Sequence, residues 1–134
     1  MSYDTKKLSS DDVKKHNLNV KLKQLKKLED ELGVKHDSGK PDMSLLPAPA
    51  LTQIAEVLTF GANKYDKHNW RKGMEWSRIS AAAMRHLVAW NEGEDLDPES
   101  RLNHLAHAAC CLTFLLTYVH DKTGIDDRYK NEKN

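Results

Sequence analysis

Three histidines fall in segments where apolar residues would otherwise pack against each other. His104 and His107 are three residues apart, and His86 belongs to an earlier apolar segment together with Arg85. Residues at a spacing of three share one face of a helix, so both imidazoles could reach the same ion or phosphate group. A lone histidine is more often a hydrogen-bonded core residue. Three at one interface indicate a site, because each costs free energy if it is buried without a partner.

An acidic segment separates His86 from the other two histidines. It contains five carboxylates and no basic residue: Glu92, Glu94, Asp95, Asp97 and Glu99. Carboxylates this close repel one another, and a bound divalent cation with a preference for oxygen ligands, Mg²⁺ or Mn²⁺, would relieve the repulsion. Solvated acidic loops are also common. The segment therefore predicts a metal site only in combination with the histidines beside it.

A basic segment lies earlier in the chain, between residues 64 and 72. It holds four basic residues and one acid, with Tyr65, Asn69 and Trp70 interleaved. Cationic side chains can bind phosphate oxygens, and exposed rings can stack on a base. The alternative is a solvated helix end, where lysines in the last turn interact favourably with the helix dipole.

Four helices are expected to position these groups. Leucines at spacings of three and four predict an amphipathic helix before residue 35, and a second apolar stripe predicts a helix over residues 51–62. Ser77 is the expected N-cap of a third helix that ends at Gly93, and a fourth helix is expected from Leu102 to about Val119. No segment alternates in the manner of a β-strand. The predicted fold is therefore all-α, a compact bundle of four to five helices.

Glycines and prolines between Gly33 and Pro49 mark the main break in the chain. We expect residues 1–35 to form an N-terminal amphipathic helix that caps its own domain or drives assembly with a partner subunit. Residues 36–120 are expected to form a helical domain that contains the candidate phosphate-, base- and metal-binding residues described above. Residues 121–134 are expected to be a frayed polar tail.

Composition excludes several functional classes. The 134 residues include 21 Lys and Arg against 20 Asp and Glu, a net charge of +1. Neither sign dominates the far field, so we expect no binding to a nucleic acid polymer through overall charge. The two cysteines are adjacent, which suits neither a disulfide framework nor a spaced metal site. With no signal peptide and no membrane segment in the sequence, we expect a cytoplasmic protein.

The ordered motifs GKPD, LLP, EVLTFGANKY, NWRKG, RHLVAWNEGEDLDPES and HLAHAA resemble those of a phage family. The resemblance is to the dATP/dGTP diphosphohydrolase N-terminal domains, which are related in function to MazG-like nucleotide pyrophosphohydrolases. It covers about residues 37–119. It implies metal-dependent hydrolysis of a purine deoxynucleoside triphosphate to the monophosphate and pyrophosphate, as control of the nucleotide pool in a phage-infected cell.

We expect a homo-oligomer with Mg²⁺ or Mn²⁺ as cofactor. The resemblance also implies roles for individual residues. The substrate contacts would be Lys40, Asp42, Lys64, Tyr65, Asn69, Trp70 and Arg71. The metal ligands would be Glu94, Asp97, His104 and His107. The catalytic groups would be His86, Arg85 and Glu99.

Two other functions are compatible with the same sequence. A phage nucleotide sponge would use the basic and aromatic segment to sequester a signalling nucleotide without hydrolysing it. A subunit or regulator would instead assemble through the N-terminal leucine helix. Binding in EDTA with return of intact ligand would identify a sponge, whereas deletion of residues 1–32 would test the role in assembly.

Overall fold

The computed structural model describes residues 9–131. Within this range it contains four α-helices, two short 3-10 helices and no β-strand, which confirms the predicted all-α class. The chain divides into two compact units, Met1–Asp42 and Met43–Asn134. None of the helices in the described range is long and apolar enough to cross a membrane.

The first unit contains helix α1, Ser10–Glu31, in the position predicted for the leucine-rich helix. Its N-terminus is closed by a capping box, in which the Ser9 hydroxyl accepts a hydrogen bond from the Asp12 amide at 3.2 Å and the Asp12 carboxylate accepts one from the Ser9 amide at 3.3 Å. The leucines of the predicted stripe remain between 48% and 68% exposed: Leu18, Leu22, Leu25, Leu28 and Leu32. Within its own unit, the helix therefore leaves this apolar face unburied.

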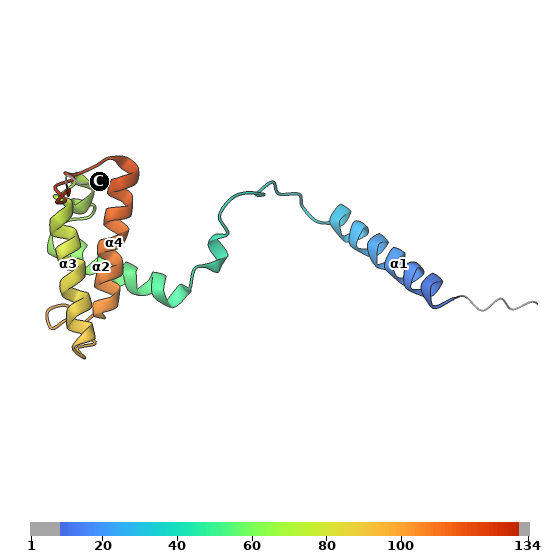
Figure 1. The fold of residues 1–134 in the computed structure, drawn as a ribbon, viewed down its shortest axis with the longest axis horizontal. Helices are drawn as coiled ribbons and strands as arrows, with labels where there is room; N and C mark the ends of the chain where they lie inside the picture. Colours follow the sequence, from blue (N-terminus) through green and yellow to red (C-terminus); the bar gives the residue numbers. More distant parts are fainter. Residues whose placement is uncertain (1–8, 132–134) are drawn as a thin grey trace, which may run out of the picture. The chain divides into compact units, whose positions relative to one another are not determined.

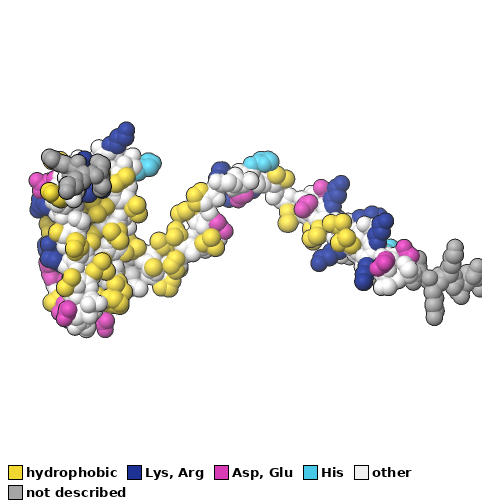
Figure 2. Space-filling model, viewed as in Figure 1, with side chains coloured by type: hydrophobic (Ala, Val, Ile, Leu, Met, Phe, Trp, Pro, Cys, Tyr) yellow, Lys and Arg dark blue, Asp and Glu magenta, His cyan; other side chains and the backbone are white. Residues whose placement is uncertain are grey.

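The second unit begins with the 3-10 helix η1, Met43–Leu45, and contains three α-helices. They are α2 (Ala48–Lys64), α3 (Trp76–Asn91) and α4 (His104–Asp121). Figure 1 shows α3 and α4 side by side and running in opposite directions. Alanines on the facing sides of both helices, Ala83 and Ala108 among them, are buried and permit close packing. Apolar side chains are visible over much of the face of this unit that Figure 2 shows.

Helix α2 packs on α4 through a small core. Val57 of α2 is buried with Ala106 and Cys110 of α4, and partly buried apolar side chains surround them. Pro47 precedes α2 as its N-cap residue, and a second proline lies in the first turn, where a missing amide hydrogen costs no helical hydrogen bond. This packing fixes the C-terminal end of α2, which carries the basic segment, beside α4.

The N-terminus of α3 differs from the prediction, and so does the tail that follows α4. The N-cap residue is Glu75, and the expected cap, Ser77, lies inside the helix. Its amide donates to the Asp127 carboxylate at 2.9 Å, and its hydroxyl donates to the same carboxylate at 2.5 Å. The Trp76 amide donates to the Ile125 carbonyl at 2.9 Å. The prediction of a frayed tail is thus wrong for residues 123–127, because they return to cap α3; residues 132–134 lie outside the described range.

Replacing Asp127 with alanine is expected to lower the melting temperature by a few degrees, because it removes the acceptor at the start of α3. Hydrogen bonds from Ser77 hold the pKa of Asp127 below its ordinary value. A lowered folded-state pKa gives stability that is complete above the ordinary pKa of 3.8 and is lost as the pH falls through the folded value. The difference in melting temperature between native protein and variant should therefore stay constant down to about pH 5 and shrink as the pH is lowered further, through and below about 3.8. A difference that stays constant below about pH 4 would contradict the charged cap.

Candidate functional site

The loop between α3 and α4, residues 92–103, is folded on itself by backbone hydrogen bonds. The Asp97 amide donates to the Leu102 carbonyl at 2.8 Å, and the His104 amide donates to the Asp95 carbonyl at 3.0 Å. Asn103 caps α4, since its side-chain oxygen accepts from the Leu105 amide at 2.7 Å. This tight connection places the last turns of α3 opposite the first turn of α4.

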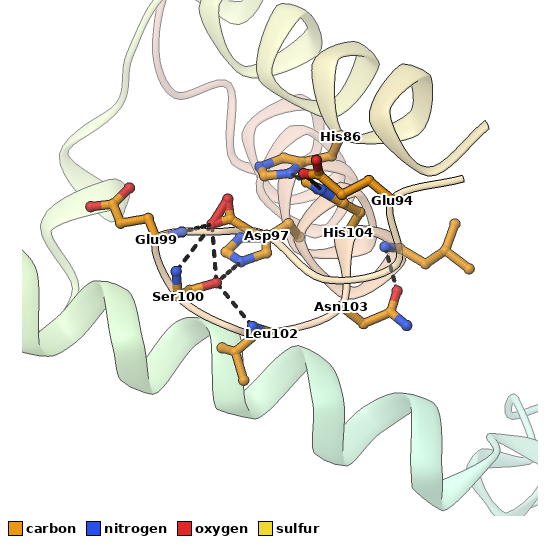
Figure 3. A network of polar contacts seen from close by, with 10 residues as sticks. His86, Glu94, Asp97, Glu99, Ser100, Leu102, Asn103 and His104 are labelled. Carbon is orange, nitrogen blue, oxygen red and sulfur yellow. Dashed lines mark hydrogen bonds and ion pairs between the residues drawn. The ribbon is translucent and has the colours of Figure 1, made fainter. Parts of the chain in front are cut away.

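The three predicted histidines meet at that junction. The Nδ1 atoms of His86 and His104 lie 2.9 Å apart, and the His86 ring stacks on His107 with centroids separated by 4.5 Å. Figure 3 shows His86 of α3 facing His104 of α4. The side chain of His104 is only 5% exposed. The expectation that the helix spacing and the short loop bring these side chains together is confirmed.

A group of potential metal ligands lies within this junction. The donor atoms of His86, Asp97 and His104 are all within 4.8 Å of one another. Two imidazole nitrogens and one carboxylate oxygen form a set that suits a divalent ion. Asp97 and His104 were predicted as ligands, whereas His86 was predicted as a catalytic group.

The other two predicted ligands contact this group from outside it. Glu94 Oε1 lies within hydrogen-bond distance of His104 Nε2, at 2.7 Å. His107 Nε2 lies 2.6 Å from the Ser100 hydroxyl. The structure thus brings all four predicted metal ligands into one network, although only two of them are members of the three-residue donor group.

Ser100 is a site residue that the sequence reasoning missed. The Asp97 carboxylate accepts hydrogen bonds from the Ser100 amide at 3.1 Å and the Ser100 hydroxyl at 3.3 Å, as well as from the Glu99 amide at 3.2 Å (Figure 3). The signal was present as an Asp followed three residues later by a Ser in a loop, the pattern of an Asx-type turn. The serine hydroxyl therefore connects the carboxylate of Asp97 to the ring of His107.

The surroundings of His86, His107 and Asp97 lower the pKa values of all three groups. Burial lowers the pKa of His86, and the neighbouring histidines lower it further. Burial also lowers the pKa of His107. Although its own partial burial acts in the opposite direction, Asp97 has a lowered pKa because Ser100 donates to its carboxylate and His107 lies close to it. At neutral pH, His86 and His107 are therefore neutral bases beside an ionised carboxylate.

A groove of about 870 Å³ opens beside the histidines. Side chains from α2, α3, α4, the acidic loop and the 3-10 helix η2 (Asn69–Lys72) line it. Five predicted substrate contacts are among them: Lys64, Tyr65, Asn69, Trp70 and Arg71. His86, Asp97, Glu99 and His107 line the same groove. An ion pair between Lys64 Nζ and Glu99 Oε1, at 2.5 Å, joins the basic segment directly to the acidic loop.

The two aromatic residues of the basic segment have different environments. The Trp70 ring stacks on Phe114 with centroids 4.4 Å apart, and the Arg71 guanidinium lies 4.5 Å from the Trp70 ring centroid. The Trp70 carbonyl accepts a hydrogen bond from the buried Tyr118 hydroxyl at 2.5 Å. Tyr65, by contrast, is 62% exposed. Trp70 therefore anchors Arg71 to the helices, and Tyr65 is the ring that is open to a ligand.

Three of the predicted site residues lie elsewhere. Arg85 is exposed and lines a separate pocket of about 480 Å³ on α3, so the structure does not bring it to the groove. Lys40 and Asp42 belong to the first unit, and their contact with substrate stays a prediction. Burial raises the pKa of the Cys110 thiol to about 12, so this thiol is not an activated nucleophile at neutral pH.

The chain is similar to known phage proteins. A family model described as dATP/dGTP diphosphohydrolase, N-terminal, matches residues 30–128. A curated protein, the dATP/dGTP diphosphohydrolase of Salmonella phage PMBT28, is 35% identical over 96 residues, which are 72% of this chain and 33% of that protein. The chain thus spans about a third of the length of that relative. No solved structure matches it significantly.

Proposed function

Because the chain belongs to the dATP/dGTP diphosphohydrolase N-terminal family, we propose that it hydrolyses a purine deoxynucleoside triphosphate to the monophosphate and pyrophosphate. The observation that carries the proposal is the groove, where the basic and aromatic segment faces the histidines and the acidic loop. A divalent cation is the proposed cofactor. The proposed setting is the cytoplasm of a phage-infected cell.

The cationic and aromatic side chains would bind the substrate. A hydrogen bond to Glu99 raises the pKa of Lys64, so this ammonium group stays charged, and Arg71 offers a fixed guanidinium held over Trp70. Together they can bind phosphate oxygens while Tyr65 stacks on the purine. A divalent cation held by His86, Asp97 and His104 would supply further positive charge toward the phosphates.

His107 is the proposed acceptor of the proton. Its ring lines the groove, burial favours its neutral form, and the Ser100 hydroxyl fixes its orientation. Water would form a bond to the α-phosphorus and lose a proton to the imidazole, and the bond from phosphorus to the leaving pyrophosphate would break. Lys64 and Arg71 would offset the negative charge that develops on the leaving group.

The first test is turnover by the full chain. It would be incubated with dGTP or dATP and Mg²⁺, Mn²⁺ or Co²⁺, and the products followed by phosphorus NMR. The proposal expects pyrophosphate in equal amount with the monophosphate. In water enriched in oxygen-18, the label should enter the monophosphate. No turnover of any purine triphosphate, or release of orthophosphate alone, would contradict it.

Replacing Tyr65 with leucine is expected to raise KM about fivefold or more, because stacking on a base contributes about 1–3 kcal/mol. The chemical step does not involve this ring, so kcat should change little. The matched control is leucine in place of Tyr129, which is 91% exposed in the tail. Steady-state kinetics with one purine triphosphate measure both values, and an unchanged KM for the Tyr65 variant would remove this ring from the binding site.

The nucleotide sponge remains the second candidate. The observation that favours it is that cationic side chains and an exposed ring, which can contact phosphate and base directly, line the groove. Calorimetry in EDTA separates the two functions, since a sponge should bind a purine nucleotide tightly without metal and release it intact. An enzyme should bind weakly under these conditions and turn its ligand over when metal is restored.

We also propose that the chain forms a homo-oligomer through the apolar face of α1. The five leucines of this stripe stay about half exposed, and two copies of the same stripe can bury each other as a two-stranded coil. Replacing Leu25 with glutamate is expected to reduce the mass measured by light scattering to that of a monomer. Glutamate in place of Lys23, on the opposite face of α1, should leave the mass unchanged. A monomeric native protein would contradict this proposal.

A further inference from the structure

The donor group at the junction of α3 and α4 is richer in nitrogen than an Mg²⁺ site. We propose that His86, Asp97 and His104 bind a first-row transition ion that favours imidazole, such as Co²⁺, Ni²⁺, Zn²⁺ or Fe²⁺, in preference to Mg²⁺ and Mn²⁺. Glu94 is the residue that orients His104 for this ion. The use of the ion in hydrolysis rests on the proposed function, whereas its binding does not.

The spacing of the two histidines fits ligands of one ion. His86 Nδ1 and His104 Nδ1 are 2.9 Å apart. Two nitrogens that are each about 2.1 Å from an ion, at a right angle to one another, are separated by about 3.0 Å. Because two unprotonated nitrogens repel at this distance, one of them carries a proton in the absence of an ion. Binding of the ion would displace that proton and leave both rings close to their present positions.

Hydrogen bonding selects the form of His104 that a metal requires. In the tautomer that donates Nε2–H to Glu94, at 2.7 Å, the lone pair resides on Nδ1, which faces His86. A carboxylate that holds the far nitrogen of a metal-binding histidine fixes its tautomer and raises its basicity. Ser100 orients the Asp97 carboxylate, because its amide and its hydroxyl both donate hydrogen bonds to it. Two of the three donors thus have an orienting partner before any ion is bound.

The same features disfavour Mg²⁺. This ion prefers six oxygen ligands in octahedral geometry and retains several waters. Here two of the three donors are nitrogens, and one of them belongs to the buried His104. Affinity for nitrogen ligands also rises from Mn²⁺ through Fe²⁺ and Co²⁺ to Ni²⁺. We therefore expect Mn²⁺ to bind weakly and Mg²⁺ to bind most weakly.

The test titrates metal-free, full-length protein with Co²⁺ alone and follows the visible absorption of the bound ion. One equivalent should bind. A hundredfold excess of Mg²⁺ should leave the signal in place, whereas an equimolar amount of Zn²⁺ should remove at least half of it. Loss of the Co²⁺ signal in the hundredfold excess of Mg²⁺, or the absence of any visible band, would overturn the proposal.

Variants assign the site. Replacing Glu94 with glutamine should weaken Co²⁺ binding about 10- to 100-fold with the stoichiometry unchanged, and replacing the half-buried His86 with asparagine should abolish the visible band. Asparagine in place of His120, an exposed histidine paired with Asp121 at 2.7 Å, is the control and should bind normally. Circular dichroism confirms that each variant is folded. Loss of Co²⁺ binding only in the His120 variant would place the site elsewhere. Selective Co²⁺ binding by the native protein without nucleotide turnover would contradict the proposed hydrolysis while supporting this inference.

Discussion

Replacing Asp97 with asparagine is expected to lower kcat/KM by about a hundredfold or more, with little effect on folding. The amide is a poorer metal ligand than the carboxylate and carries no negative charge to balance an ion or a protonated His107. The asparagine side-chain oxygen can still accept the hydrogen bond that the Ser100 amide donates to Asp97 at 3.1 Å in the native protein, so the loop should keep its shape. Steady-state kinetics under saturating metal measure the effect, and circular dichroism verifies the fold.

The control for this experiment is the same substitution at Asp66, which lines the same groove but lies outside the donor group. Its kcat/KM should remain within about threefold of the native value. Raising the metal concentration should restore part of the activity of the Asp97 variant if the defect is in ion binding. A variant with native kcat/KM at low metal concentration would show that Asp97 is structural.

The helices and the meeting of the histidines could be predicted because both depend on local features. Apolar periodicity fixes α2, α3 and α4 to within a few residues, and a short loop forces α3 and α4 to be antiparallel. The spacing of three between His104 and His107 then leaves only one face on which His86 can meet them. The junction follows from the order of residues alone.

What could not be predicted depends on contacts distant in sequence or on the path of a loop. The capping of α3 by Asp127 joins residues 50 positions apart, and a serine in a helix start looks the same with or without such a partner. The sequence of five acids in one loop does not indicate which of them lies near the histidines. Asp97 joins the donor group, whereas Glu94 contacts the opposite ring nitrogen of His104, Nε2. That distinction is set by backbone turns, which residue type alone does not specify.

Replacing Gly124 with alanine is expected to destabilise the protein by about 3 kcal/mol or more. Gly124 has a φ of +77°, and an added Cβ would meet the Met74 carbonyl oxygen well inside contact distance. The Cβ cannot be accommodated by a small shift, because backbone atoms surround it on this side. The Ile125 amide donates to the same Met74 carbonyl at 3.1 Å, so relief of the clash would disrupt the connection that caps α3.

Gly93 provides a control that separates backbone strain from steric overlap. It also has a positive φ, +95°, yet nothing lies within 4 Å of the position its Cβ would take. Alanine at Gly93 should therefore cost only the conformational strain, about 1 kcal/mol. Urea unfolding followed by circular dichroism gives both free energies. An equal loss of unfolding free energy in the two variants would mean that positive φ alone requires glycine at position 124. The larger loss expected for the Gly124 variant would show that the close approach of the tail to Met74 secures the start of α3.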